Sequence, residues 1–181
     1  MKDSFIWSSD FETGINTVDD QHHHLIDLIN SFSNLFIKQD VTKEDVATLI
    51  TELLDYTHYH FDEEEDLMHE KGLHAYFIQN HNEFHNSFIK QLGYMKDHML
   101  LGSAQEWRIL LDFLYQWLGH HILGLDQIMA RQIVLIEQGL SAEQAMKEEN
   151  SKSEHDVVEP LLMALSSMVE LLSEQNTQMS D

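Results

Sequence analysis

The sequence predicts an all-α protein, an antiparallel up-down-up-down four-helix bundle with an additional C-terminal helix. Apolar residues recur at helical spacing along almost the whole 181-residue chain, and no segment alternates in polarity as a half-buried strand does. Residues that form turns are scarce, with seven glycines and one proline, which favours a few long elements. Long helices joined by short connections are typical of bundles whose neighbouring helices run in opposite directions.

Capping residues and glycines delimit the four helices, which we expect at about residues 18–38, 42–71, 75–100 and 104–123, with the fourth resuming after Gly124 as far as residue 138. Thr42, followed three residues later by Asp45, predicts an N-cap for the second helix, and Ser103 predicts one for the fourth. Gly72 and Gly139 would end the second and fourth helices, because glycine is favoured just after a helix C-terminus.

The composition changes after residue 138. Residues 141–156 are polar and charged, which indicates an exposed helix or a linker. Apolar residues then return at helical spacing over 158–172, which predicts an amphipathic helix of about two heptads. We therefore expect a bundle domain at 1–138 and a helical extension at 139–181. The extension's helix either packs on its own bundle or pairs outside it, and both alternatives stay open.

Composition excludes several partners and chemistries. A formal net charge of −22 opposes binding to nucleic acid or to an anionic membrane surface, because both would repel a polyanion. The absence of cysteine rules out disulfides, zinc–thiolate sites and iron–sulfur clusters. No apolar stretch is typical of a signal peptide or long enough to cross a bilayer. We expect a cytoplasmic protein.

The chain has thirteen histidines, and some of them fall on the apolar faces of the predicted helices. At about 100° per residue, His60 and Glu64 lie in the same stripe as Leu53, whereas His58 and Glu65 belong to the outer face. The same geometry turns histidines of the other three helices inward. The inward set is His22, His60, Glu64, His81, His85 and His121.

A metal site explains this inward set better than separate core histidines do. One buried histidine is usually a hydrogen-bonded core residue, but five imidazoles and a carboxylate in one core are costly to bury without compensation. A bound metal supplies that compensation. Nitrogen and oxygen donors without thiolate suit iron, manganese, zinc or copper. Neither a Glu-x-x-His pair nor an HExxH motif is present.

The motifs resemble those of the hemerythrin family of non-heme diiron proteins, in its bacterial branch, over about residues 5–138. The resemblance is carried by Trp7, "TGI" at 13–15, "DDQH" ending at His22, "HFDEEEDLM" from His60, "HNEFH" at 81–85 and "WLGHHILGLD" from Trp117 to Asp126.

The resemblance implies two iron ions (Fe²⁺/Fe³⁺) with an oxo or hydroxo bridge, and dioxygen as their ligand. It implies seven metal ligands, namely His22, His60, Glu64, His81, His85, His121 and Asp126. One iron would be bound by His81, His85 and His121, and the other by His22 and His60. Glu64 and Asp126 would bridge the two irons. The second iron would then have an open position, where dioxygen binds.

Helical phase alone does not find Asp126. His121 and Asp126 are five residues apart, or about 140° on a regular helix, so they converge only if the helix loosens between them. Gly124 is well placed to permit this.

An apolar pocket is expected beside the five-coordinate iron. Its predicted lining is Leu25, Ile29, Phe61, Trp117, Leu118 and Ile122. A dry pocket without an acid favours reversible binding over oxidation, so we expect no enzymatic activity.

Three functions remain as hypotheses. The first is reversible dioxygen binding, as a carrier or as an oxygen- or redox-sensing domain. The second is a diiron oxidase or peroxidase, and the third is a helix-mediated interaction module with a structural metal. The C-terminal helix resembles the linkers that join hemerythrin domains to signalling output domains, so a homodimer or a fused or partner output domain are candidate partners.

Overall fold

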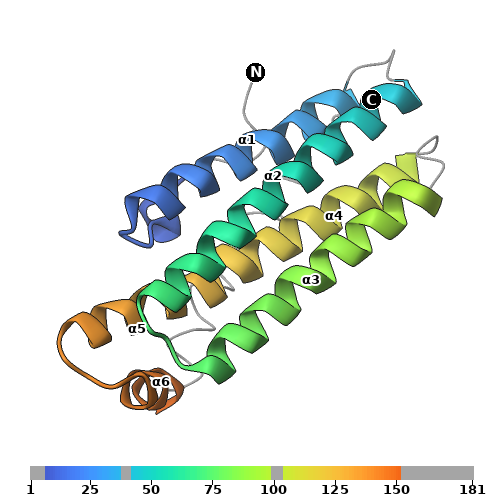
Figure 1. Cartoon of the computed structure of the whole chain (residues 1–181). Coiled ribbons are helices and arrows are strands. Elements are labelled where there is room, and N and C mark those ends of the chain that lie inside the picture. The colour runs from blue at the N-terminus through green and yellow to red at the C-terminus, as the bar shows by residue number, and fades with distance from the viewer. Residues whose placement is uncertain (1–6, 38–41, 99–103, 152–181) are drawn as a thin grey trace.

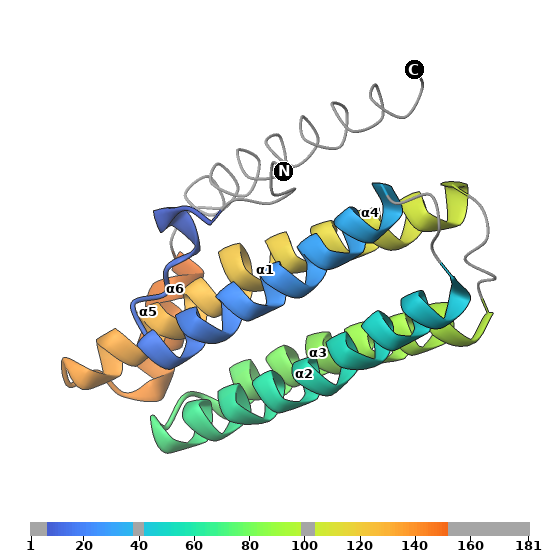
Figure 2. The same cartoon turned by 90° about the horizontal axis from the view of Figure 1, so that it is seen from above.

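The computed structural model describes residues 7–37, 42–98 and 104–151. Four helices run side by side and alternate in direction, as predicted (Figure 1). They are α1 (Asn16–Ile37), α2 (Lys43–Glu70), α3 (Ala75–His98) and α4 (Ala104–His120). Figure 2 shows α1 and α4 as one layer of the bundle and α2 and α3 as the other. The described residues contain no strand, and the all-α four-helix bundle is confirmed.

The fourth bundle helix continues through an irregular turn. After α4 comes a π-helical turn, η2 (His121–Asp126), and then α5 (Gln127–Glu137). A short 3₁₀ turn, η1 (Ser9–Phe11), precedes α1. A further helix, α6 (Ala142–Ser151), follows α5 and packs against it.

The predicted caps around α2 are confirmed by their hydrogen bonds. The Thr42 hydroxyl accepts the Asp45 N–H at 3.1 Å, and the Asp45 carboxylate accepts the Thr42 N–H at 2.9 Å, which makes a capping box. At the other end, Gly72 has φ +69, and the next N–H, of Leu73, donates to the carbonyl of Met68 at 3.0 Å. This left-handed residue closes the helix, as glycine does most easily. Ser103 lies outside the described residues.

Two apolar clusters occupy the interior. The large core cluster includes Leu25, Phe32, Ile50, Phe88, Leu114 and Ile122. The small core cluster consists of Val18, Met68, Leu73, Ile78, Met129 and Ile133. Along α1, α2 and α3, and along α4 with its continuation through η2 into α5, buried polar residues separate members of the two clusters. On α3, for example, His81 and His85 lie between Ile78 and Phe88. The interior therefore contains a polar layer closed by apolar side chains on both sides.

The first part of the predicted extension is a helix held against the bundle. Ala145 of α6 is fully buried, and Arg131 Nε of α5 lies 2.7 Å from Glu149 Oε2 of α6. The rest of α6 is mostly exposed, and the amphipathic helix predicted at 158–172 lies outside the described residues. Within the described ranges, no helix combines the length and the apolar character needed to span a membrane.

Candidate metal centre

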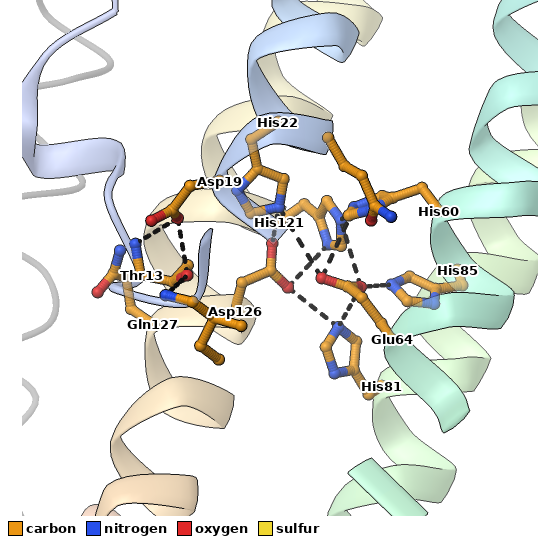
Figure 3. A network of polar contacts seen from close by, with 12 residues as sticks. Thr13, Asp19, His22, His60, Glu64, His81, His85, His121, Asp126 and Gln127 are labelled. Carbon is orange, nitrogen blue, oxygen red and sulfur yellow. Dashed lines mark hydrogen bonds and ion pairs between the residues drawn. The ribbon is translucent and has the colours of Figure 1, made fainter. Parts of the chain in front are cut away.

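The seven residues expected as ligands come together in the polar layer (Figure 3). None is more than 3% exposed, although all of them carry polar or titratable groups. Every bundle helix contributes: His22 from α1, His60 and Glu64 from α2, His81 and His85 from α3, and His121 and Asp126 from η2 at the end of α4.

Regular helix geometry brings the first two pairs together. His60 and Glu64 are one turn apart, with Nε2 and Oε1 separated by 3.6 Å, and the rings of His81 and His85 have centroids 4.4 Å apart. Their outward neighbours confirm the predicted phase, since His58, Asp62 and Asp66 are exposed. The carboxylates at residues 62–66 are therefore mainly exposed to solvent, and Glu64 is the one that is buried in the site.

A π-helical turn brings the third pair together. Residues five apart lie above one another in a turn with i→i+5 hydrogen bonds, and here His121 Nδ1 lies 3.3 Å from Asp126 Oδ1. The predicted loosening is thus present. Gly124 itself lacks a positive φ, and a Cβ added there would meet His120 Nδ1 at 3.8 Å, an ordinary contact. The turn therefore does not depend on the conformational freedom of glycine, contrary to our expectation.

The two carboxylate oxygens of Glu64 face two different groups among the five histidines. Oε1 lies 3.8 Å from His22 Nε2 and 3.6 Å from His60 Nε2, and we call these two residues the histidine pair. Oε2 faces the histidine triad, with distances of 3.7, 3.3 and 3.8 Å to Nε2 of His81, His85 and His121.

Asp126 makes the same division from the opposite side. Its Oδ2 lies 3.1 Å from Nε2 of His22, a member of the pair. Its Oδ1 lies 3.2 Å from Nε2 of His81 and near His121, both members of the triad. Each carboxylate thus offers one oxygen to each group, which is the arrangement that a carboxylate bridging two metal ions needs.

His121 lies at the boundary between the two groups. Its Nε2 is only 3.2 Å from Nε2 of His60. Two sets of potential ligand atoms are close enough to hold an ion, and they share Glu64 and His121. The two sets are His22, His60, Glu64 and His121, and Glu64, His81, His85 and His121.

Unsatisfied polar atoms support a metal at this site. Most of the buried side-chain atoms without a hydrogen-bond partner in the described chain belong to this cluster, including both oxygens of Glu64 and of Asp126 and both ring nitrogens of His22 and His81. Buried polar groups are normally paired, because an unpaired one costs about 1–3 kcal/mol. Metal coordination would satisfy many of them at once, and the donor set of imidazoles and carboxylates suits iron.

Burial also prepares the imidazoles for coordination. Burial, reinforced by neighbouring histidines, lowers the pKa of His60 to about 3 and that of His85 to about 2, and burial lowers the pKa of His121 well below its usual value. These rings are therefore neutral at pH 7, with a lone pair available for a metal.

The two carboxylates differ in their titration. Burial and the charge of Asp126 raise the pKa of Glu64 well above its usual value. Burial also acts to raise the pKa of Asp126, but the nearby imidazoles of His121, His22 and His81 hold that pKa well below its usual range. In the metal-free site, Asp126 is therefore the carboxylate that ionises more readily, and Glu64 is the one that keeps its proton to higher pH.

The six residues predicted to line an oxygen pocket are all buried in the large core cluster. Phe61 stacks on His85 with ring centroids 3.7 Å apart, and Trp117 stacks on His121 at 4.5 Å. These contacts are with the histidine triad, whereas we expected the lining beside the pair. Leu25, Ile29, Leu118 and Ile122 are fully buried, and their part in a pocket stays a prediction.

A residue that the sequence reasoning did not assign contacts the pair. Gln21 is buried on α1, and its Oε1 lies 2.7 Å from Nδ1 of His60 on α2. Its position directly before His22, inside the "DDQH" motif, was the available signal. One step of 100° turns it away from the His22 direction, so helical phase did not select it.

The loop before α1 holds the same end of the site. The Asp19 carboxylate accepts the N–H and the hydroxyl of Thr13, both at 2.7 Å, and the N–H of Gly14 at 3.1 Å (Figure 3). Gln127, adjacent to Asp126, donates to the carbonyl of Glu12 at 3.0 Å. Residues 12–14 thus connect the start of α1 with the start of α5, directly after η2.

Fold and site together define a class, the metal-binding helical bundles in which histidines and carboxylates from all four helices share one buried layer. Comparison with known proteins makes the class specific. The family model for the hemerythrin HHE cation binding domain matches residues 13–133, and the chain belongs to the hemerythrin family.

Curated relatives agree with this family. The chain is 34% identical over 131 residues to a bacteriohemerythrin of Stenotrophomonas maltophilia, which covers 71% of this chain and 80% of that protein. It is 33% identical over 133 residues to a bacteriohemerythrin of Clostridium acetobutylicum, covering 68% and 96%. A hemerythrin-like protein of Naegleria gruberi is 31% identical over 122 residues, covering 67% and 87%. The buried cluster fits a diiron centre.

Proposed function

We propose that this chain binds dioxygen reversibly at a non-heme diiron centre, as an oxygen carrier or as an oxygen- or redox-sensing domain. The observation that carries the proposal is the matching division of the histidines by Glu64 and Asp126. Each carboxylate directs one oxygen to the pair and the other to the triad. One metal ion would not call for two carboxylates oriented in this way.

The seven residues would divide between two iron ions. The pair, His22 and His60, would hold one ion, and the triad, His81, His85 and His121, would hold the other, with Glu64 and Asp126 bridging both and an oxo or hydroxo group completing the bridge. Two iron ions bound there would supply electrons and an open coordination position for dioxygen. The pair offers one histidine fewer, so the open position belongs on its side.

The surrounding residues favour binding over turnover. The large and small core clusters exclude water from both sides of the polar layer, and the neutral imidazoles of His60 and His85 are poor proton donors at pH 7. Release of a reduced oxygen product requires protons, so this environment supports reversible binding.

The test combines metal analysis with optical spectra. We expect two irons per chain, and a colour change that reverses as oxygen is added to and removed from the reduced protein. Glu64→Gln should lower the iron content, because a neutral amide cannot bridge two ions as a carboxylate does. Its matched control is Glu65→Gln, since Glu65 is a partly exposed neighbour outside the seven-residue cluster and forms an ion pair with exposed His69.

The competing functions predict different outcomes. One metal per chain, or zinc alone in protein made with iron available, would rule out the diiron centre. Sustained turnover with peroxide release would favour an oxidase or peroxidase. Partner binding that survives loss of iron in His60→Ala would favour an interaction module with a structural metal.

A further inference from the structure

Among the site histidines, His60 has an unusual contact at the far side of its ring. Its Nε2 faces Glu64, while its Nδ1 lies 2.7 Å from the amide oxygen of Gln21. The Nδ1 atoms of His22 and His81, by contrast, are buried without any hydrogen-bond partner. Gln21 is itself 8% exposed, so water competes little for this contact.

The chemistry of the two atoms determines the tautomer. An amide oxygen can only accept a hydrogen bond, so Nδ1 of His60 must carry the proton. A neutral imidazole protonated at Nδ1 has its lone pair on Nε2, which is the nitrogen directed into the site. Gln21 therefore selects the form of His60 that can coordinate a metal.

Gln21 is in turn held by the neighbouring helix. Its amide nitrogen donates to the Tyr59 hydroxyl at 3.4 Å, which agrees with the amide oxygen facing His60. The Tyr56 hydroxyl donates to the Gln21 carbonyl, also at 3.4 Å. Tyr59 thus contacts the side-chain amide and Tyr56 the backbone carbonyl of Gln21, so both parts of Gln21 are held by the helix that carries His60.

We infer that Gln21 is a positioning residue that sets the tautomer and the ring orientation of His60, and so the strength of metal binding on the side of the histidine pair. The inference rests on the proposed role of His60 as a metal ligand. Partners of this kind commonly contribute 10- to 100-fold to metal affinity, because they fix the ring and increase the basicity of the coordinating nitrogen.

Three variants of the full chain test the inference. Gln21→Leu removes the acceptor, and Gln21→Glu keeps an acceptor for the Nδ1 proton. Gln132→Leu is the matched control, because Gln132 is a buried glutamine, 1% exposed, outside the seven-residue cluster. The readouts are cobalt(II) affinity by chelator competition, nitrogen-15 NMR of the His60 ring in the metal-free protein, and the reduction potential of the iron-loaded protein.

The three variants should give different results if Gln21 positions the His60 ring. Gln21→Leu should weaken the binding of one of two cobalt ions by about 10- to 100-fold, with an unchanged helical circular dichroism spectrum. The His60 ring should lose its single tautomer. Gln21→Glu should restore the affinity and lower the reduction potential, because a carboxylate acceptor makes the imidazole a stronger donor. Gln132→Leu should bind cobalt as the wild type does.

Two results would overturn the inference. One is a Gln21→Leu variant with wild-type cobalt affinity and an unchanged His60 tautomer. The other is a Gln21→Glu variant as impaired as Gln21→Leu. Failure of the proposed function appears differently, as a wild-type protein that does not bind two metal ions or does not respond to oxygen.

Discussion

Three consecutive histidines near the start of α1 lie in three different surroundings. His22 is fully buried beside Asp126, His23 stacks on Trp7 with ring centroids 3.7 Å apart, and His24 tilts against Tyr56 at 4.2 Å. Steps of about 100° around one helix are enough to produce this difference. The role of a histidine here is therefore decided by its helical phase, and among the histidines that the structure describes only five lie in the site.

The titration of Glu64 predicts that metal binding strengthens as the pH rises. Burial and Asp126 raise its pKa, so Glu64 keeps its proton to higher pH than an exposed glutamate does, and a bridging metal must displace that proton. His60 and His85, with pKa values of about 3 and 2, have already lost their protons at mildly acidic pH and add no dependence there. Cobalt(II) affinity should rise with pH, by about tenfold per pH unit for each proton that the metal displaces.

Competition titrations at several pH values measure this slope. Glu65→Gln should keep it, because that side chain lies outside the cluster. An affinity that does not change from mildly acidic to neutral pH would contradict the assignment of the proton to Glu64.

At the scale of an element, some glycines of this chain end a helix in a left-handed conformation, and another lies inside a helical turn without one. Gly72 has φ +69 and ends α2, and Gly139 has φ +101 and ends α5 through the same pattern of N–H bonds. Gly124 lies inside η2 without a positive φ. Of these three glycines, only Gly72 and Gly139 occupy the left-handed backbone region that other residues avoid.

Alanine substitutions should distinguish a glycine that its backbone conformation requires from one that it does not. Gly72→Ala should lower the free energy of unfolding by about 1–2 kcal/mol. No atom lies within 4 Å of the added Cβ, so the loss comes from left-handed backbone strain alone. Gly124→Ala should be nearly neutral and keep its metal, because the added Cβ makes an ordinary contact. Denaturant unfolding measures the stability of the two variants, and metal analysis measures their iron content. A Gly124→Ala variant that loses iron would show that the π turn needs glycine after all.

At the scale of the whole molecule, all seven residues of the described cluster precede α6. The last residue of the cluster is Asp126, and the family match ends at residue 133. α6 adds the buried Ala145 and the contact between Arg131 and Glu149. The division into a bundle domain at 1–138 and an extension at 139–181 stays a proposal, since α6 belongs to the extension and packs on α5 of the bundle.

Truncation after Leu140 should therefore leave metal binding intact. The cap formed by Gly139 and Leu140 on α5 is retained, with the Leu140 N–H donating to the carbonyl of Leu135 at 3.1 Å. We expect the wild-type iron content per chain and a lower melting temperature, because the face of α5 under α6 becomes exposed. A truncated chain that is helical but binds no iron would place α6 within the functional unit.

Much of this architecture follows from local rules. Phase along regular helices selects His60, Glu64, His81 and His85, because residues one turn apart share a face. Caps and glycines predicted α2 to within about a residue at each end (43–70 against 42–71). Local patterns work here because long amphipathic helices leave few alternative arrangements.

Two site residues needed information beyond local rules. Asp126 is out of phase with His121 on a regular helix, so only the family motif predicted it, and the π turn explains why. Gln21 gains its importance from a contact with His60 on another helix, and such a contact depends on how α1 packs on α2. No pattern within one helix reports that packing.

The closure of the polar layer has a consequence for the lifetime of a bound metal. Val18 and Met129 close one side of the layer, and Leu25 and Ile122 close the other, all 3% exposed or less. A bound ion could not leave until helices separated, so its departure would be governed by the opening rate of the bundle. The time course of metal loss to a chelator would then measure the kinetic stability of the fold itself.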